Sequence, residues 1–294
     1  MRLFICTLLS LLCLISALPS FAIDAETIVL PGIGHGAQKV DDYVQEVSLD
    51  PITLPKKISN FEFLEAERAL APNFLRDQTG FWTAPFRVKV RDLAWLIPAS
   101  GILTTLLLVD DDFSKALTNN HHPSTTQTDI SKAFAQIGGY APILGLPGGL
   151  LLTGAIAKND RLRETGVLQY EALGNAAILG TVSQLIAGRN KPNNAKKGRG
   201  EFFEGGTSFP SGHSIASWAL ASVASRQYPD KKWVPVVGYT LASLVSVSRV
   251  LQGTHYPSDM FAGAVLGYLI GKYVVKYRSK HSPRYKDKES TSKQ

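Results

Sequence analysis

Beyond residue 22, apolar residues gather into six stretches that are separated by polar connections. The first two have the length and the lack of charge of membrane-spanning helices. The fourth and fifth are shorter and contain many alanine and serine residues, which suit close packing between helices. The stretches run from Leu93 to Val109, Ala133 to Ala157, Ala172 to Ala187, His213 to Ala224, Val234 to Val247 and Met260 to Val275.

This pattern predicts an all-α fold, in which residues 91–277 form a membrane-embedded helical bundle of about six helices. The mean hydropathy of the chain is only +0.02, which is low for a protein with six spans. A compact helical protein outside the membrane, with short apolar helices as its core, therefore stays open as an alternative.

The segments on either side of this predicted bundle have a different character. Residues 1–22 are predicted to be a signal peptide, because an apolar stretch follows Arg2 and small residues stand at Ser20 and Ala22. An uncleaved signal anchor is the alternative. The only cysteines, Cys6 and Cys13, lie inside this segment, so a cleaved chain would contain no thiol.

Residues 23–90 mix proline, glycine and charge, and are expected to form a partly irregular arm whose last part, Phe81 to Phe86, rests at the membrane interface. Residues 278–294 are rich in lysine, arginine and serine, and are predicted to be a disordered basic tail. The acidic run Asp110 to Asp112 and the pair His121-His122 are interpreted as a solvated connection rather than as metal ligands.

The candidate chemistry lies in two short blocks about forty residues apart. The first is Pro210-Ser211-Gly212-His213, in which a serine near a helix start and a glycine predict a cradle of N–H groups for an anion. The second is Ser248-Arg249, five residues, His255, three residues, Asp259. Pro257 favours a helix start, which would place Asp259 in the first turn beside His255.

These residue types are the ones that cleavage of a phosphate ester needs. A catalyst must neutralise the phosphoryl oxygens, place a nucleophile in line and protonate the departing alkoxide. A neutral imidazole can attack phosphorus if a carboxylate holds its other ring nitrogen. Ser211 or Asp259 alone could simply be a helix cap or a first-turn charge. Two histidines and an arginine in the same blocks are not required for capping, and they favour a functional site.

The two blocks resemble the second and third signature motifs of the type 2 phosphatidic acid phosphatase and vanadium haloperoxidase superfamily, and the resemblance extends over roughly residues 92–276. The first motif of that family is lysine, six residues, then Arg-Pro. Counted back from Pro192, this chain has Gln184 in place of the lysine and Lys191 in place of the arginine. Arg189 could supply the missing guanidinium.

The resemblance implies a role for each matching residue. His255 would be the nucleophile that forms a phosphohistidine, Asp259 its orienting partner and His213 the general acid. The remaining residues would hold the phosphate: Arg249, Lys191, Ser211 and Gly212, with Arg189 and Gln184 as less direct candidates. The resemblance implies no metal and no other cofactor, because positive side chains take that place.

The expected function is that of a lipid phosphate phosphatase acting on a phosphate monoester or diphosphate. A lipid phosphotransferase, a soluble periplasmic acid phosphatase and a catalytically impaired homologue are the alternatives, together with vanadate-dependent halide oxidation. The expected partners are an anionic lipid phosphate and membrane lipids, but no nucleic acid. The sequence leaves the oligomeric state open.

Charge bears on both substrate and location. The formal net charge is +7, and a basic cluster that begins at Arg189 would draw in an anionic substrate. The expected location is a bacterial cell envelope, integral to the inner membrane, with the site on the periplasmic side as the resemblance implies. A cleaved signal followed by six spans would instead place the loops that carry Arg189 and His255 in the cytoplasm.

Overall fold

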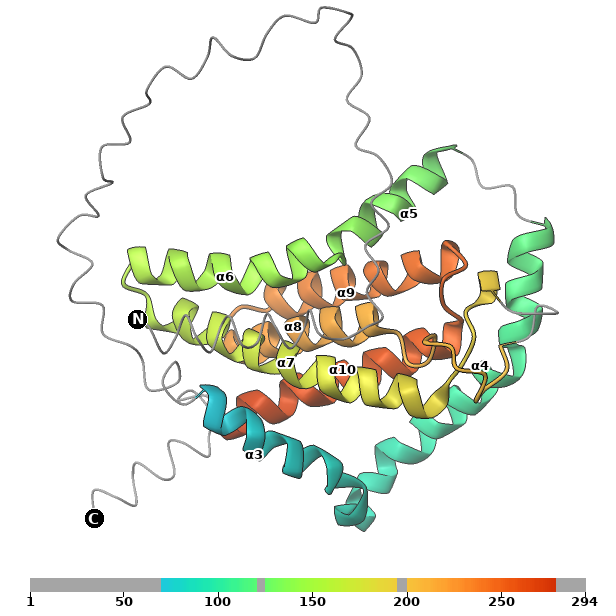
Figure 1. Ribbon diagram of the computed structural model, residues 1–294. Coiled ribbons are helices and arrows are strands. Elements are labelled where there is room, and N and C mark those ends of the chain that lie inside the picture. The colour runs from blue at the N-terminus through green and yellow to red at the C-terminus, as the bar shows by residue number, and fades with distance from the viewer. Residues whose placement is uncertain (1–69, 121–124, 195–199, 279–294) are drawn as a thin grey trace, which may run out of the picture. The chain divides into compact units, whose positions relative to one another are not determined.

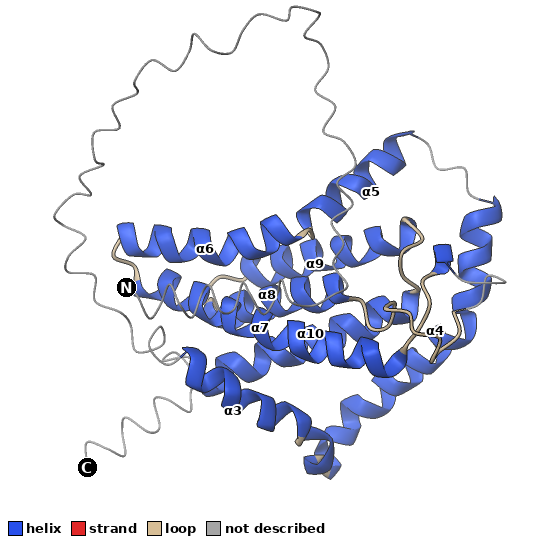
Figure 2. Cartoon of the chain, viewed as in Figure 1, coloured by secondary structure: helices blue, strands red, loops and turns tan. Residues whose placement is uncertain are grey.

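The structure, a computed structural model, describes residues 70–120, 125–194 and 200–278. All regular secondary structure in these ranges is helical (Figure 2). The predicted signal peptide, residues 23–69 of the predicted arm, the pair His121-His122 and residues 279–294 of the predicted tail lie outside the described residues.

The six predicted stretches correspond to α4 through α10, so the all-α fold is confirmed. Three short 3-10 helices are also present in the described residues: η3 (Ala84–Arg87) and η4 (Val90–Asp92) lie before α4, and η5 (Pro192–Asn194) lies between α7 and α8. The α-helices are α3 (Leu70–Trp82), α4 (Leu93–Asn120), α5 (Thr125–Ile137), α6 (Tyr140–Ile156), α7 (Asp160–Ala187), α8 (Gly212–Gln227), α9 (Trp233–Leu251) and α10 (Pro257–Arg278).

The second predicted stretch is divided into two helices, α5 and α6, which meet at an angle of 47°. The break falls at Gly138-Gly139, where the chain passes close to α9. A Cβ atom on Gly138 would lie 2.2 Å from the Val245 side chain, so this approach requires glycine. The bend places Tyr140 at the start of α6, beside the first turn of α8.

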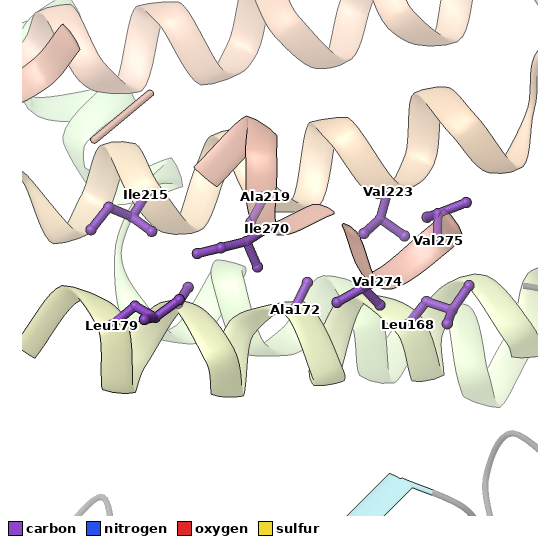
Figure 3. Packing of buried hydrophobic residues seen from close by; sticks show 10 residues of the cluster. Leu168, Ala172, Leu179, Ile215, Ala219, Val223, Ile270, Val274 and Val275 are labelled. Carbon is purple, nitrogen blue, oxygen red and sulfur yellow. The ribbon is translucent and has the colours of Figure 1, made fainter. Parts of the chain in front are cut away.

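The core lies between α7, α8 and α10, as Figure 3 shows for Ala172, Ala219 and Ile270. The helices α8 and α10 approach each other closely because Gly263, Gly267 and Gly271 form a stripe along α10. A Cβ atom on Gly267 would lie 2.2 Å from the Ile215 carbonyl oxygen of α8. This close packing fixes the start of α10 against the start of α8.

The helices α4 and α9 are long and apolar enough to cross a membrane, and the bent pair α5–α6 would be a third span, by length and composition. Large apolar side chains on these helices are exposed, such as Leu108 at 78% and Val236 at 66%. Such surfaces suit contact with lipid rather than water. The protein is therefore a membrane-embedded helical bundle.

Two interpretations of the sequence are wrong at particular residues. Asp110 to Asp112 do not form a solvated connection: they belong to α4, and Asp110 is fully buried. Arg278 does not begin a disordered tail, because it ends α10 and forms ion pairs with Asp77 of α3 and Glu171 of α7. In both cases a buried partner distant in sequence determines the structure of the charged residue.

Candidate active site

The residues of the two sequence blocks meet at one end of the bundle, where α8 and α10 begin and α7 and α9 end. His213 lies in the first turn of α8, and Arg249 in the last turn of α9. His255 is two residues before the start of α10, and Asp259 lies in its first turn, as the position of Pro257 predicts. Figure 1 shows that the loop after α7 lies beside α4 at this end.

His255 is held in one tautomer by the main chain. Its Nδ1 atom lies 2.9 Å from the Ser208 carbonyl oxygen and 3.7 Å from Oδ2 of Asp259. Because a carbonyl oxygen can only accept, Nδ1 carries the proton, and the lone pair for attack is on Nε2. The predicted hydrogen bond to the carboxylate is therefore replaced by one to Ser208, and Asp259 contributes its charge from slightly further away.

Asp259 is fully buried and receives three hydrogen bonds. Arg189 Nη1 donates to Oδ1 at 2.7 Å, while Ser208 Oγ and the Tyr256 backbone N–H donate to Oδ2 at 2.5 and 2.8 Å. Burial by itself would raise the pKa of Asp259, but the neighbouring His255, Arg189 and Ser208 side chains lower it below its ordinary value. The carboxylate is therefore ionised beside His255.

Arg189 is not positioned as a phosphate ligand. Its side chain is buried, with Nη1 donating to Ser258 Oγ and to Asp259, Nη2 donating to Asp110 at 2.8 Å, and Nε donating to the Gly200 carbonyl at 3.1 Å. The guanidinium also lies over the Tyr256 ring, 4.1 Å from its centroid. These contacts tie α4 and the loop after α7 to the start of α10.

The Pro210-Ser211-Gly212-His213 block lies beside the first turn of α10. The Ser211 backbone N–H donates to the Asp259 carbonyl oxygen at 3.0 Å, and Gln184 Nε2 donates to the Pro210 carbonyl oxygen at 2.9 Å. Gln184 is therefore adjacent to the block, as the register counted from Pro192 predicts, although one of its amide hydrogens is used within the protein. Ser211 Oγ is buried and has no hydrogen-bond partner among the described residues.

Two cationic side chains, Arg249 and Lys191, act on His213 electrostatically. His213 lies in the first turn of α8, which is not one of the candidate membrane spans. Burial, followed by the charges of Arg249, His255 and Lys191, lowers the pKa of His213 to about 3. The ring of His213 is neutral under these conditions, and a bound phosphate dianion would favour its protonation by opposing the surrounding positive charge.

Four residues of the site were not assigned from the sequence: Asp110, Ser208, Ser258 and Tyr140. The Tyr140 ring lies 6.0 Å from the His213 ring, centroid to centroid, because the break between α5 and α6 brings it there. Ser208 lies two residues before the first block and Ser258 lies inside the second, so their positions in the sequence were an available signal. Nothing in the sequence marked Tyr140, since its contact depends on the path of another helix.

The fold and the site together define a helical membrane protein with a histidine–carboxylate pair, a second histidine and two cations at one end of the bundle. The PAP2 superfamily profile matches residues 166–283, which include both blocks and the degenerate first motif. The chain belongs to the PAP2 superfamily. Asp110 and Tyr140 lie outside the matched residues.

Individual relatives are similar over part of the chain. A lipid A 1-phosphatase from Porphyromonas gingivalis is 32% identical over 109 residues, which is 36% of this chain and 22% of that protein. A decaprenylphosphoryl-5-phosphoribose phosphatase from Mycobacterium tuberculosis is 34% identical over 125 residues, 42% of this chain and 67% of that protein. The chain thus spans about a fifth and about two thirds of the lengths of these two relatives.

Among solved structures, the transmembrane PAP2-type phosphatidylglycerolphosphate phosphatase of Bacillus subtilis is similar, with a TM-score of 0.49 and 23% identity. The similarity covers 63% of this chain and 96% of that one.

The contacts of Arg189 predict a structural effect of its removal. Arg189→Ala would leave Asp110 and Asp259 buried without their shared cation, which should lower the free energy of unfolding by about 3–5 kcal/mol. Lys191→Ala, two residues away and half-buried, is the matched control and should change stability by less than about 1 kcal/mol. Thermal unfolding of the detergent-solubilised protein measures both. Equal stability of the two variants would contradict the role assigned to Arg189.

Proposed function

We propose that this protein is a lipid phosphate phosphatase that cleaves a phosphate monoester or diphosphate through a phosphohistidine on His255. The observation that carries this proposal is that His213, Arg249, Lys191 and His255 meet at one end of the bundle, with the Nδ1 atom of His255 bonded to the Ser208 carbonyl oxygen. Two of the buried polar side-chain atoms without a partner among the described residues also belong to this site, Ser211 Oγ and Arg249 Nε. An unpaired buried polar group costs about 1–3 kcal/mol, so such groups are normally paired. Phosphoryl oxygens would accept hydrogen bonds from both.

The arrangement of protons supports this chemistry. With Nδ1–H held by Ser208, the His255 Nε2 lone pair attacks phosphorus, and the bond from phosphorus to the leaving oxygen breaks. His213, protonated once the dianion is bound, gives its proton to the leaving alkoxide. Water then attacks the phosphohistidine, His213 takes a proton from it, and inorganic phosphate and neutral His255 are released.

The positive charges of the site would stabilise the phosphoryl group during transfer. Arg249 and Lys191 both act on His213 electrostatically, so they lie close enough to act on a phosphate beside it. Arg249 Nη1 also donates to Gln252 Oε1 at 3.4 Å, and Gln252 Nε2 donates to the Ser131 carbonyl oxygen of α5 at 3.1 Å. The helix α5 therefore helps to hold Arg249 in place.

An apolar groove of about 490 Å³ supports a lipid substrate. It is lined by α4, α8, α9 and α10, through Trp95, Trp218, Val247 and a face of α10 from Met260 to Lys272. It begins at the residue after Asp259 and follows α10 for roughly 18 Å at 1.5 Å per residue. We propose that a hydrocarbon chain of the substrate occupies this groove while the phosphate lies at His255.

We also propose an inner-membrane location with the active site on the periplasmic side. The end of the bundle away from the site carries Lys158 in the connection before α7, Arg161 and Arg163 in the first turn of α7, and Lys231 and Lys232 in the connection before α9. Lysine and arginine collect in cytoplasmic loops, so this end is expected to face the cytoplasm. At the other end, Arg249 and Lys191 are accounted for by substrate binding, and Arg189 by its ion pairs with Asp110 and Asp259.

The nucleophile provides the first test. His255→Ala should lower phosphate release from a lipid phosphate by several orders of magnitude, because no other residue is proposed to bond phosphorus. Release of inorganic phosphate from phosphatidic acid, phosphatidylglycerol phosphate and a polyprenyl diphosphate by the purified protein measures it. Release near that of the wild type would refute the mechanism, and transfer of the phosphate to an added alcohol would indicate a phosphotransferase.

The groove predicts a change in substrate preference. Val247→Trp should raise the KM for a long-chain lipid phosphate by about tenfold. The indole would occupy part of the groove and displace a few methylene groups of the bound chain, whose burial contributes about 1 kcal/mol or more to binding. Turnover of a short-chain, water-soluble phosphate ester should stay unchanged. Val236→Trp, on the same helix but outside the groove, is the control. A similar loss on both substrates would argue against a chain in the groove.

The orientation is tested by cysteine labelling, because a cleaved chain would contain no thiol of its own. Lys232→Cys, in the turn between α8 and α9, should react with a membrane-impermeant maleimide only after spheroplasts are permeabilised. Asn193→Cys, at the active-site end, should react in intact spheroplasts. The reverse pattern would place the active site in the cytoplasm.

A further inference from the structure

Asp110 lies in α4, outside the family match, yet it contacts the helix that carries Asp259. It is fully buried, and all of its hydrogen-bond partners are donors. Its Oδ1 accepts from the Ser258 backbone N–H at 3.1 Å, and its Oδ2 accepts from Arg189 Nη2 at 2.8 Å and from Ser258 Oγ. The guanidinium and the backbone N–H can only donate, so both oxygens of Asp110 act as acceptors, as the oxygens of an ionised carboxylate do.

Asp110 changes the net charge of the ion-pair group that lies on the Nδ1 side of His255. Arg189 bonds Asp259 directly, and this pair alone would have no net charge. With Asp110 on the other side of the guanidinium, the group of three has a net charge of −1. Phosphorylation of Nε2 while Nδ1 keeps its proton makes the imidazole ring a cation, and nearby negative charge stabilises a cation.

We propose that Asp110 is a positioning residue for phosphoryl transfer in this protein, which acts through Arg189 and Ser258 to hold Asp259 and to keep the charge behind His255 negative. The proposal rests on the proposed function. Its mechanism is indirect, because Asp110 contacts no reacting atom. In this proposal α4 supplies a negative charge near His255 in addition to that of Asp259.

The test compares Asp110→Asn with Asp112→Asn, which removes the same charge from an exposed position two residues further along α4. The measurements are the rate of phosphohistidine formation by rapid quench with a labelled lipid phosphate, and the steady-state kcat and KM. Asp110→Asn should lower kcat and the rate of phosphohistidine formation by about tenfold or more, with KM within about twofold. Asp112→Asn should match the wild type.

A further variant separates positioning from folding. Ser258→Ala keeps both aspartates and removes only the hydroxyl between Asp110 and Arg189, so it should slow phosphohistidine formation several-fold with little change in thermal unfolding. If Asp110→Asn does not fold, a wild-type rate for Ser258→Ala overturns the proposal. A wild-type rate for a folded Asp110→Asn also overturns it, as does an equal loss in Asp112→Asn.

The failure of this inference is distinguishable from the failure of the proposed function. If the wild-type protein forms no phosphohistidine on His255, the proposed function fails. If the wild type forms it and the Asp110 variant forms it equally fast, the function stands, and Asp110 serves only to join α4 to α10.

Discussion

The buried pairing of Arg189 with Asp110 and Asp259 is the interaction on which the arrangement of this site depends. A guanidinium has five N–H donors in a fixed plane, and four contacts of Arg189 use that geometry to join three segments of the chain. None of these charges could be buried alone at an acceptable free energy, so each requires the others. The position of Asp259, and with it the surroundings of His255, follows from this requirement.

The packing of α8 against α10 supplies a second constraint. Because glycines on α10 allow its backbone to approach α8, the two helices begin side by side, and the Ser211 N–H reaches the Asp259 carbonyl oxygen. The start of α8 and the histidine–carboxylate pair are thus held next to each other. Larger side chains on that stripe would separate the two halves of the site, however well each half was formed.

The site divides its charges in a way that suits phosphoryl transfer. In the proposed function, the positive charges of Arg249 and Lys191 act on a phosphate beside His213, whereas the Asp259 carboxylate lies 3.7 Å from His255 Nδ1, the ring nitrogen that does not attack. Positive charge therefore faces the group that is negative in the substrate, and negative charge faces the ring that becomes positive. The α4 helix contributes to both regions, because its Trp95 lines the apolar groove and its Asp110 accepts a hydrogen bond from Arg189.

The sequence by itself determined the helices and most of the residues that the structure brings together at the candidate site. Runs of apolar residues predict helices because a helix satisfies its own backbone locally, and the Pro257 helix start placed Asp259 correctly. The spacing of the two blocks was enough to bring forward His213, Arg249, His255 and Asp259 as candidates.

Only the tertiary structure decided the partners. The break at Gly138, the use of Arg189 in ion pairs and the burial of Asp110 each depend on residues distant in the sequence. An aspartate at the end of an apolar helix has the same local pattern whether it faces solvent or an arginine 79 residues away. The difference is the free energy of a buried charge, which is set by what packs against it rather than by its neighbours in the chain.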